Sequence, residues 1–269
     1  MIASFPKSAL AKVAFSALTA MALTACGGGG GGSDSASGGN GAGVGLAVNG
    51  TVARGAAISN ATVRLSCANG AELSATSGTD GSFGTNQAAI VYPCIGTATA
   101  GTLIYRGILF SSSTANFTPL TDLLVQTVLA ASASGAASLT QAEFLAKIRS
   151  DSTFAANVSS AASVVAFRNS VINVIKAQLV ASGRTQAEAD AILAAGTNFY
   201  DQPFTIGSAL DRVLDNLASL IQNADGSLRA TILALIKAAG DLLATPPSGG
   251  ATGGTGGTGG TGGTGGTGG

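Results

Sequence analysis

The chain of 269 residues contains no histidine and no tryptophan, and only 10% of its residues are charged. Histidine supplies the base of Ser–His–Asp triads and is a common zinc ligand, so its absence excludes His-dependent triads and all His metal sites. Lys and Arg total 13, and Asp and Glu also total 13. Because a broad nucleic-acid-binding surface needs a clustered positive field, this balance argues against a nucleic-acid partner.

The first 26 residues have the pattern of an export signal. Lys7 and Lys12 form a basic start, and residues 13–25 are uncharged. This stretch is shorter than the ~20 residues that a helix needs to cross a bilayer, which favours a signal peptide. Its removal would leave 11 basic and 13 acidic residues, a formal net charge of −2.

The signal ends in Leu23, Thr24, Ala25 and Cys26. This resembles the bacterial lipobox, in which a Leu and two small residues precede a Cys. The resemblance implies that cleavage removes residues 1–25 and that Cys26 carries a diacylglyceryl thioether and an acylated amine. Such chains hold a protein to a membrane, because each buried methylene contributes about 0.8 kcal/mol. The alternatives are an ordinary signal peptide with a chance Cys, or an uncleaved anchor.

Two glycine-rich segments flank the remaining chain. Residues 26–45 follow cleavage and are dominated by Gly and Ser, which predicts a flexible tether. Gly27 stands where an Asp in Gram-negative lipoproteins favours retention in the inner membrane. The resemblance therefore implies the outer membrane, with the protein facing the periplasm or the cell surface. Residues 246–269 are mainly Gly-Gly-Thr repeats without large apolar side chains, which predicts a disordered tail.

Residues 46–118 have the pattern of short β-strands. Val63, Leu65 and Cys67 alternate with polar residues, as in a half-buried strand, and residues 103–110 form a further apolar run. Turn signals recur at short spacing and indicate a small antiparallel β-sandwich. They include Gly50, Gly70, Gly81, Gly101 and Gly107.

Three pieces of this segment follow one another in a recognisable order. They are V-N-G-T-V at 48–52, A-T-V-R-L at 61–65 and T-D-G-S-F at 79–83. The order is similar to that of the carboxypeptidase regulatory-like (prealbumin-like) domain. The resemblance implies a β-sandwich and a module without catalytic activity.

Cys67 and Cys94 are the remaining cysteines. An exported compartment permits disulfides, so we expect a structural bond between them that joins two sheets, with Cys67 facing inward. Closing a loop of about 28 residues would contribute roughly 3–4 kcal/mol on the chain-entropy model. Their spacing is not that of a C-x-x-C redox pair. Two buried, unreactive thiols are the fallback.

Residues 119–245 have the pattern of a helical segment rich in Ala. Thr118 is predicted to cap a helix that begins at Pro119, with Asp122 near its positive end. The sequence T-Q-A-E occurs at 140–143 and again at 185–188, and each copy predicts a capping box. Gly183 is a plausible helix stop.

Three apolar stripes at helical spacing predict a bundle of one-sided helices. The stripes are Val164, Phe167, Val171, Val174, Ile175 and Gln178; Leu210, Val213, Leu214, Leu217, Leu220 and Ile221; and Leu228, Ile232, Leu235, Ile236, Ala239, Leu242 and Leu243. The polar faces carry charges of both signs, which favours a bundle over helices lying on a membrane. Pro246 and Pro247 are predicted to end the last helix.

Two features could carry chemistry, and neither fits. A calcium loop around Asn223–Ser227 would place Ile221 and Ile232 at ligand positions that require oxygen donors, so a helix–turn–helix corner is the preferred interpretation. Asp211 and Asp215 lie one helical turn apart and are interpreted as part of a solvated face beside Arg212. We therefore expect no catalytic residue, no metal site and no cofactor.

The sequence thus predicts an α+β multi-domain protein. A tether (26–45) precedes a β-sandwich (46–118), an Ala-rich helical bundle (119–245) and a tail (246–269). The expected function is a non-catalytic structural or interaction module of the cell envelope, with another envelope protein or a glycan as its partner. One alternative is a glycan- or ligand-binding module that uses Tyr92 or Tyr105. Another is a hydrolase that works without His.

Overall fold

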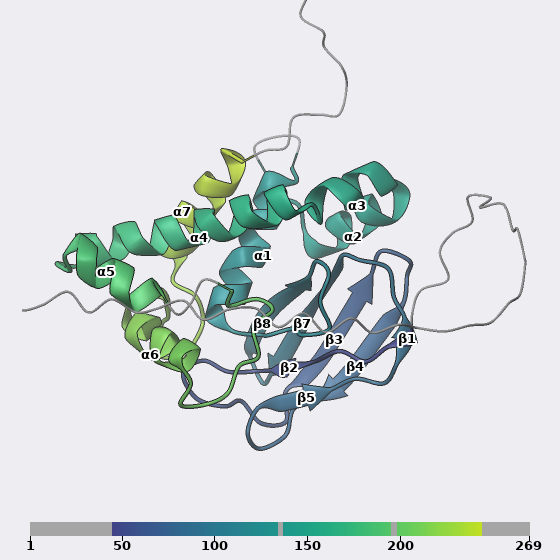
Figure 1. Cartoon of the computed structure of the whole chain (residues 1–269), viewed down its shortest axis with the longest axis horizontal. Helices are drawn as coiled ribbons and strands as arrows, with labels where there is room; N and C mark the ends of the chain where they lie inside the picture. Colours follow the sequence, from purple (N-terminus) through teal and green to yellow (C-terminus); the bar gives the residue numbers. More distant parts are fainter. Residues whose placement is uncertain (1–44, 134–136, 195–197, 244–269) are drawn as a thin grey trace, which may run out of the picture. The chain divides into compact units, whose positions relative to one another are not determined.

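The computed structural model describes residues 45–133, 137–194 and 198–243, and it has an α+β fold in which strands precede helices (Figure 1). The predicted signal and lipid-attachment residues Leu23, Thr24, Ala25 and Cys26 lie outside the described residues. So do the predicted tether up to residue 44 and the tail 246–269.

The described strands form three antiparallel sheets. The main sheet has four strands in the order β4-β3-β7-β8, and two small sheets pair β1 with β6 and β2 with β5. The strands are β1 (Gly45–Leu46), β2 (Asn49–Thr51), β3 (Thr62–Cys67), β4 (Glu72–Thr76), β5 (Ser82–Gly84), β6 (Ala88–Ala89), β7 (Cys94–Ala100) and β8 (Leu103–Leu109).

The helices occupy the second half of the described chain. They are α1 (Pro119–Ala131), α2 (Gln141–Ser150), α3 (Ser152–Val158), α4 (Ala161–Ala181), α5 (Gln186–Leu193), α6 (Ala209–Ile221) and α7 (Ala230–Asp241). Thr118 caps α1, and Pro119 is its first residue, as the sequence predicts. Both T-Q-A-E copies form capping boxes, at the starts of α2 and α5. Helix α4 ends just before Gly183, whose φ of 99° matches the predicted stop.

The main sheet contributes side chains to two buried clusters. Val63, Leu65 and Cys67 belong to a cluster formed within the β segment. Ile95 and Ile108, on neighbouring strands, belong instead to the cluster built by the helices. Successive residues of a strand point to opposite faces. The helical segment therefore packs on one face of the sheet, and helix α1 lies against β8 (Figure 1).

A partly buried ion pair joins this helix to the sheet. Arg106 of β8 donates to Asp122 of α1 over 3.0 Å, and Asp122 is buried. Burial raises the pKa of Asp122, while the Arg106 charge opposes that rise. Asp122 therefore does more than lie near the positive end of a helix, because it fixes α1 to β8.

Two predicted turn glycines lie instead within strands. Gly50 is in β2, and Gly107 is in β8. A Cβ at Gly50 would overlap the carbonyl of Ala115, and one at Gly107 would lie 2.8 Å from the carbonyl oxygen of Asn116. The segment that precedes α1 crosses both positions, so close approach of backbones requires glycine there. Gly70, Gly81 and Gly101 do have the positive φ of turn residues.

The residues of the predicted helical stripes are buried or partly buried, except for two that are exposed. Leu235 and Leu242 of the last stripe are 40% and 88% exposed. The buried residues of α7 are Ile232, Ile236 and Gly240, and Leu233 is partly buried against the helical cluster. The last predicted stripe is therefore too wide, because it assigned an outward-facing flank of the helix to the core.

Helix α4 is the one helix among the described residues that is long and apolar enough to cross a membrane. Its stripe, including Phe167, Val171 and Ile175, is buried in the helical cluster. Lys176, at the margin of this buried face, forms an ion pair with Asp190 of α5. One face of α4 thus packs in the helical cluster, whereas Val165 and Val180 are exposed.

Candidate functional site

The expected bond between Cys67 and Cys94 is present, but its place differs from the expectation. The two residues are directly opposite each other on β3 and β7, which are neighbours in the main sheet. The bond therefore joins adjacent strands of one sheet and not two sheets. The expectation was wrong because period-two spacing shows which face Cys67 occupies but not which strand lies beside it.

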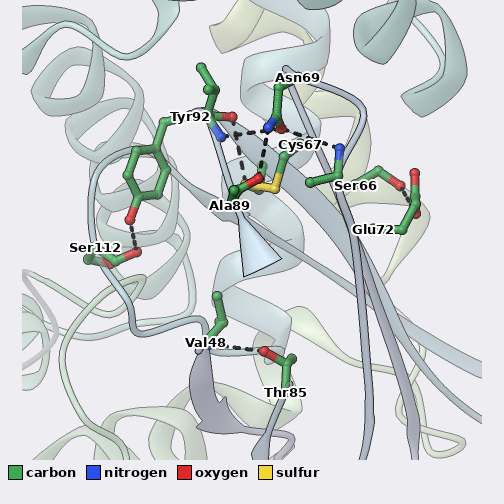
Figure 2. Close-up of a disulfide and its surroundings, with 12 residues drawn as sticks. Val48, Ser66, Cys67, Asn69, Glu72, Thr85, Ala89, Tyr92 and Ser112 are labelled. Atoms are coloured by element: carbon green, nitrogen blue, oxygen red, sulfur yellow. Dashed lines mark hydrogen bonds between the residues drawn. A yellow bond between two sulfur atoms is a disulfide. The ribbon is translucent and has the colours of Figure 1, made fainter. Parts of the chain in front are cut away.

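The surroundings of this disulfide are held by backbone and side-chain hydrogen bonds (Figure 2). The side-chain Nδ2 of Asn69 donates to the carbonyl of Ala89 over 2.8 Å, and the hydroxyl of Tyr92 donates to the carbonyl of Ser112 over 2.9 Å. Both cysteines are fully buried. Since thiol exchange needs access to a sulfur, this environment favours a brace over a reactive pair.

A cavity of about 430 Å³, here named the arginine cavity, lies between the chain after β2 and the corner that joins α6 to α7. It is lined by Arg54, Ala218, Ser219, Gln222, Asn223, Ala224, Gly226 and Arg229. Sequence reasoning did not select any Arg or Gln of this set. One local signal existed, because Arg229 stands at the start of a helix where a Ser, Thr or Asp cap would be expected.

Asn223–Ser227 forms the corner between α6 and α7, as the sequence predicts. The backbone N–H and the hydroxyl of Ser227 donate to Asp225 Oδ1 over 2.9 and 2.7 Å. The bond from the Ser227 hydroxyl has the largest effect, and together the two bonds hold the pKa of Asp225 below its usual range. Gly226 has a φ of 86°, which favours glycine. The carboxylate thus stabilises a turn.

Two side chains fix this corner to the β segment. The hydroxyl of Tyr105 donates to the carbonyl of Gly226 over 2.7 Å, and Nη1 of Arg54 donates to the carbonyl of Asp225 over 3.0 Å. Tyr105 is only 1% exposed, and burial raises its pKa. The expectation that Tyr105 could contact a glycan is therefore wrong. Its ring lies in the same buried cluster as Leu109, a later residue of β8 that points to the same face of the sheet.

The arginine cavity is rich in hydrogen-bond donors. Nε of Arg229 donates to the carbonyl of Gln222 over 2.9 Å. Gln222 is only 6% exposed, and its Nε2 has no hydrogen-bond partner within the described part of the chain. Donors of this kind suit an acceptor-rich ligand.

A second cavity of about 230 Å³, here named the tyrosine cavity, lies between the residues that follow β8, the start of α4 and residues 200–201. It is lined by Phe110, Ser111, Ser112, Ser159, Ala161, Val164, Val165, Tyr200 and Asp201. The rings of Phe110 and Tyr200 meet edge to face, with centroids 6.0 Å apart. Burial raises the pKa of Asp201, and the Ser159 hydroxyl has no partner among the described residues. Its hydroxyls, carboxyl and ring edge suit a neutral polar ligand.

The paired carboxylates of α6 have different environments. Asp215 is exposed, but Asp211 is only 4% exposed and accepts from the N–H of Gly207 over 2.7 Å. The interpretation of both as a solvated face is therefore wrong for Asp211, which helps to close the N-terminus of α6. Within residues 45–133, 137–194 and 198–243, no group of three or more Asp, Glu or Cys could hold a metal ion.

No protein-family model, curated protein or solved structure matches this chain.

Proposed function

We propose that this chain is an exported lipoprotein of the Gram-negative outer membrane, held to the lipid through Cys26, with a non-catalytic folded part. The observation that carries the proposal is the sequence Leu23–Cys26 after a basic start and a short apolar stretch. The Cys67–Cys94 disulfide supports it, because such bonds persist in exported proteins.

Two observations support a non-catalytic role. The chain has no His, and two groups whose pKa values are raised, Asp122 and Tyr105, form hydrogen bonds that hold the fold together. Asp122 is bonded to Arg106, and Tyr105 is bonded to the backbone of Gly226. Each of these groups thus joins two elements of the fold. An envelope protein or a glycan is the proposed partner of this module.

For the finer fold, we propose a small sandwich of the carboxypeptidase regulatory-like type followed by a helical bundle. Val52 and Phe83, from the β2–β5 side, share one buried cluster with Val63 and Leu65 of the main sheet. That arrangement is the one expected when two layers of strands enclose a core.

Mass spectrometry of the N-terminal peptide, taken from protein expressed in a Gram-negative envelope, tests the anchor. We expect a mature chain that begins at Cys26 and carries acyl mass on both its thiol and its amine. The matched variant Cys26→Ser should lose the acyl mass and leave the membrane fraction. A mature chain that begins elsewhere, or a Cys26 without lipid, would overturn the proposal.

The second candidate function is binding of a neutral polyhydroxyl ligand in the tyrosine cavity. Its support is the ring of Tyr200 beside Asp201 and three serines, a set that combines an apolar face with hydrogen-bonding groups. A glycan array with the wild type and Tyr200→Ala tests it, and Ile104→Ala is the control at an exposed apolar residue outside the cavity. Hits that survive Tyr200→Ala would reject this site. Turnover of esterase, peptidase or glycosidase substrates by the purified protein would favour a His-free hydrolase instead.

A further inference from the structure

The arginine cavity contains more hydrogen-bond donors than its own contacts use. We propose that it binds a small organic anion through a carboxylate or phosphate group. Its volume of about 430 Å³ lies within the roughly 300–1,000 Å³ of small-molecule sites. The proposal concerns a ligand site and is independent of the lipid anchor.

The two guanidinium groups supply the charge. Arg54 donates through Nη1 to one neutral carbonyl, that of Asp225, and Arg229 donates through Nε to another, that of Gln222. A guanidinium carries five N–H donors, and its fork matches the two oxygens of a carboxylate or phosphate. Both side chains belong to exposed residues, so a ligand can reach them from solvent.

Gln222 supplies a second and independent observation. The residue is more than nine-tenths buried, lines the same cavity, and leaves its side-chain Nε2 without a partner among the described residues. A buried amide without a partner is unfavourable, and most buried donors are paired. An acceptor oxygen in the cavity would satisfy this donor.

The start of α7 also contributes a positive potential to the arginine cavity. Six described helices, α1 to α6, begin at a Ser, Thr or Asp whose side chain accepts a backbone N–H. Helix α7 is preceded by Arg229, whose side chain makes no such bond. The N-terminus of a helix is its positive end, so this position favours an anion beside Arg229.

Two carboxylates limit which anions fit. Asp225 is bonded to Ser227 and stays charged, and the carboxylate of Asp215 lies over Gly55, where a Cβ would be 2.6 Å from its Oδ1. Their charges offset those of the two arginines at longer range. The site therefore suits a small ligand with one or two acidic groups and disfavours an extended polyanion.

Titration of the purified intact protein with succinate, glucose 6-phosphate and neutral glucose, followed by calorimetry, tests the proposal. We expect the two anions to bind in the millimolar range or tighter, and glucose to show no binding. Raising the salt concentration should weaken binding, because exposed charges are screened. Lack of binding by both anions at low salt would overturn the proposal.

Variants locate the site. Arg54→Gln and Arg229→Gln should each weaken anion binding about tenfold, since each removes a charge-assisted contact. Arg64→Gln, at an exposed arginine on β3 outside the cavity, is the matched control and should bind as the wild type does. Thermal unfolding of each variant checks that the fold is retained. An equal loss in Arg64→Gln, or no loss in either cavity variant, would show that the anions bind elsewhere.

Discussion

The tripeptide Asp-Gly-Ser occurs at 80–82 and at 225–227, and the two copies fold into the same turn in different surroundings. In each, the Ser N–H and hydroxyl donate to one Asp oxygen, over 3.0 and 2.7 Å in the first copy and 2.9 and 2.7 Å in the second. The two Gly φ values are 77° and 86°. The same three residues thus adopt the same turn in both places.

The neighbours of each turn differ. Gly81 lies against the backbone oxygen of Val52, within the β segment. Gly226 lies against the side chain of Arg54, and its carbonyl accepts from Tyr105, 121 residues earlier in the sequence. The first turn joins two strands, whereas the second fixes a helical corner to a sheet and lines a cavity. The role of a turn therefore depends on distant residues that its own sequence does not contain.

Substitution of the two glycines should separate the turns most strongly. Gly81→Ala should cost about 3 kcal/mol of unfolding free energy, because a Cβ at positive φ would also lie 2.5 Å from the fixed oxygen of Val52. Gly226→Ala should cost about 1–2 kcal/mol, because the obstacle is Nη1 of Arg54, the end of a flexible side chain. Urea unfolding measures both. Equal losses would mean that the surroundings do not matter.

Removal of the Tyr105 hydroxyl affects the second turn alone. Tyr105→Phe should cost about 1–2 kcal/mol, because the buried Gly226 carbonyl loses its donor. Hydrogen exchange should speed up around 223–227 and stay unchanged around 79–82. Tyr92→Phe, at a half-buried tyrosine bonded to Ser112, is the control for loss of a hydroxyl. Equal protection at 223–227 in Tyr105→Phe and wild type would contradict the docking role.

The same tyrosine predicts a loss of stability at alkaline pH. Its folded-state pKa is raised above the ordinary value of 10, so the unfolded state loses the proton first. The stabilising contribution is complete below pH 10 and is lost as the pH rises above that value. The urea midpoint of the wild type should therefore fall between pH 9 and pH 11, and Tyr105→Phe should show a smaller fall. Parallel profiles for the two proteins would reject Tyr105 as the cause.

The smallest expected effect is common to both turns. Hydrogen bonds from Ser82 and Ser227 lower the pKa values of Asp80 and Asp225 below 3.8 in the folded state. The unfolded state then takes up protons first as the pH falls, so stability present above pH 4 is lost in acid. Asp80→Asn and Asp225→Asn should each flatten the decline of the urea midpoint between pH 5 and pH 2. A difference between the two would indicate a further contribution from Arg54.

Local sequence predicted the features that depend on few neighbours. The Thr118 cap, both T-Q-A-E boxes and the stop at Gly183 need only residues within one helical turn. The strand 62–67 and the inward face of Cys67 follow from alternation. The sequence also predicted that Cys67 and Cys94 would bond, but the strand order that makes them neighbours depends on the whole sheet.

Features that depend on contacts distant in sequence were missed. The pair Asn49-Gly50 predicts a turn from local sequence alone. Gly50 lies in a strand because the segment at 113–117 packs against β2, and that contact is distant in sequence. Arg54 and Gln222 line one cavity because Tyr105 and Arg54 fix the α6–α7 corner to the β segment. The sequence did contain one signal for the burial of Tyr105. Alternate residues of a strand point to the same face, so Tyr105 lies on the same inward face of β8 as Leu109.

Ile95 and Ile108 are buried by helices that come later in the chain. A fragment cut after residue 118 would present these side chains to water as an apolar patch, and such patches promote aggregation. We expect this fragment to precipitate unless the missing portion is added back, a result that light scattering would record. One face of the earliest main-sheet strands thus depends for its cover on residues that are synthesised last.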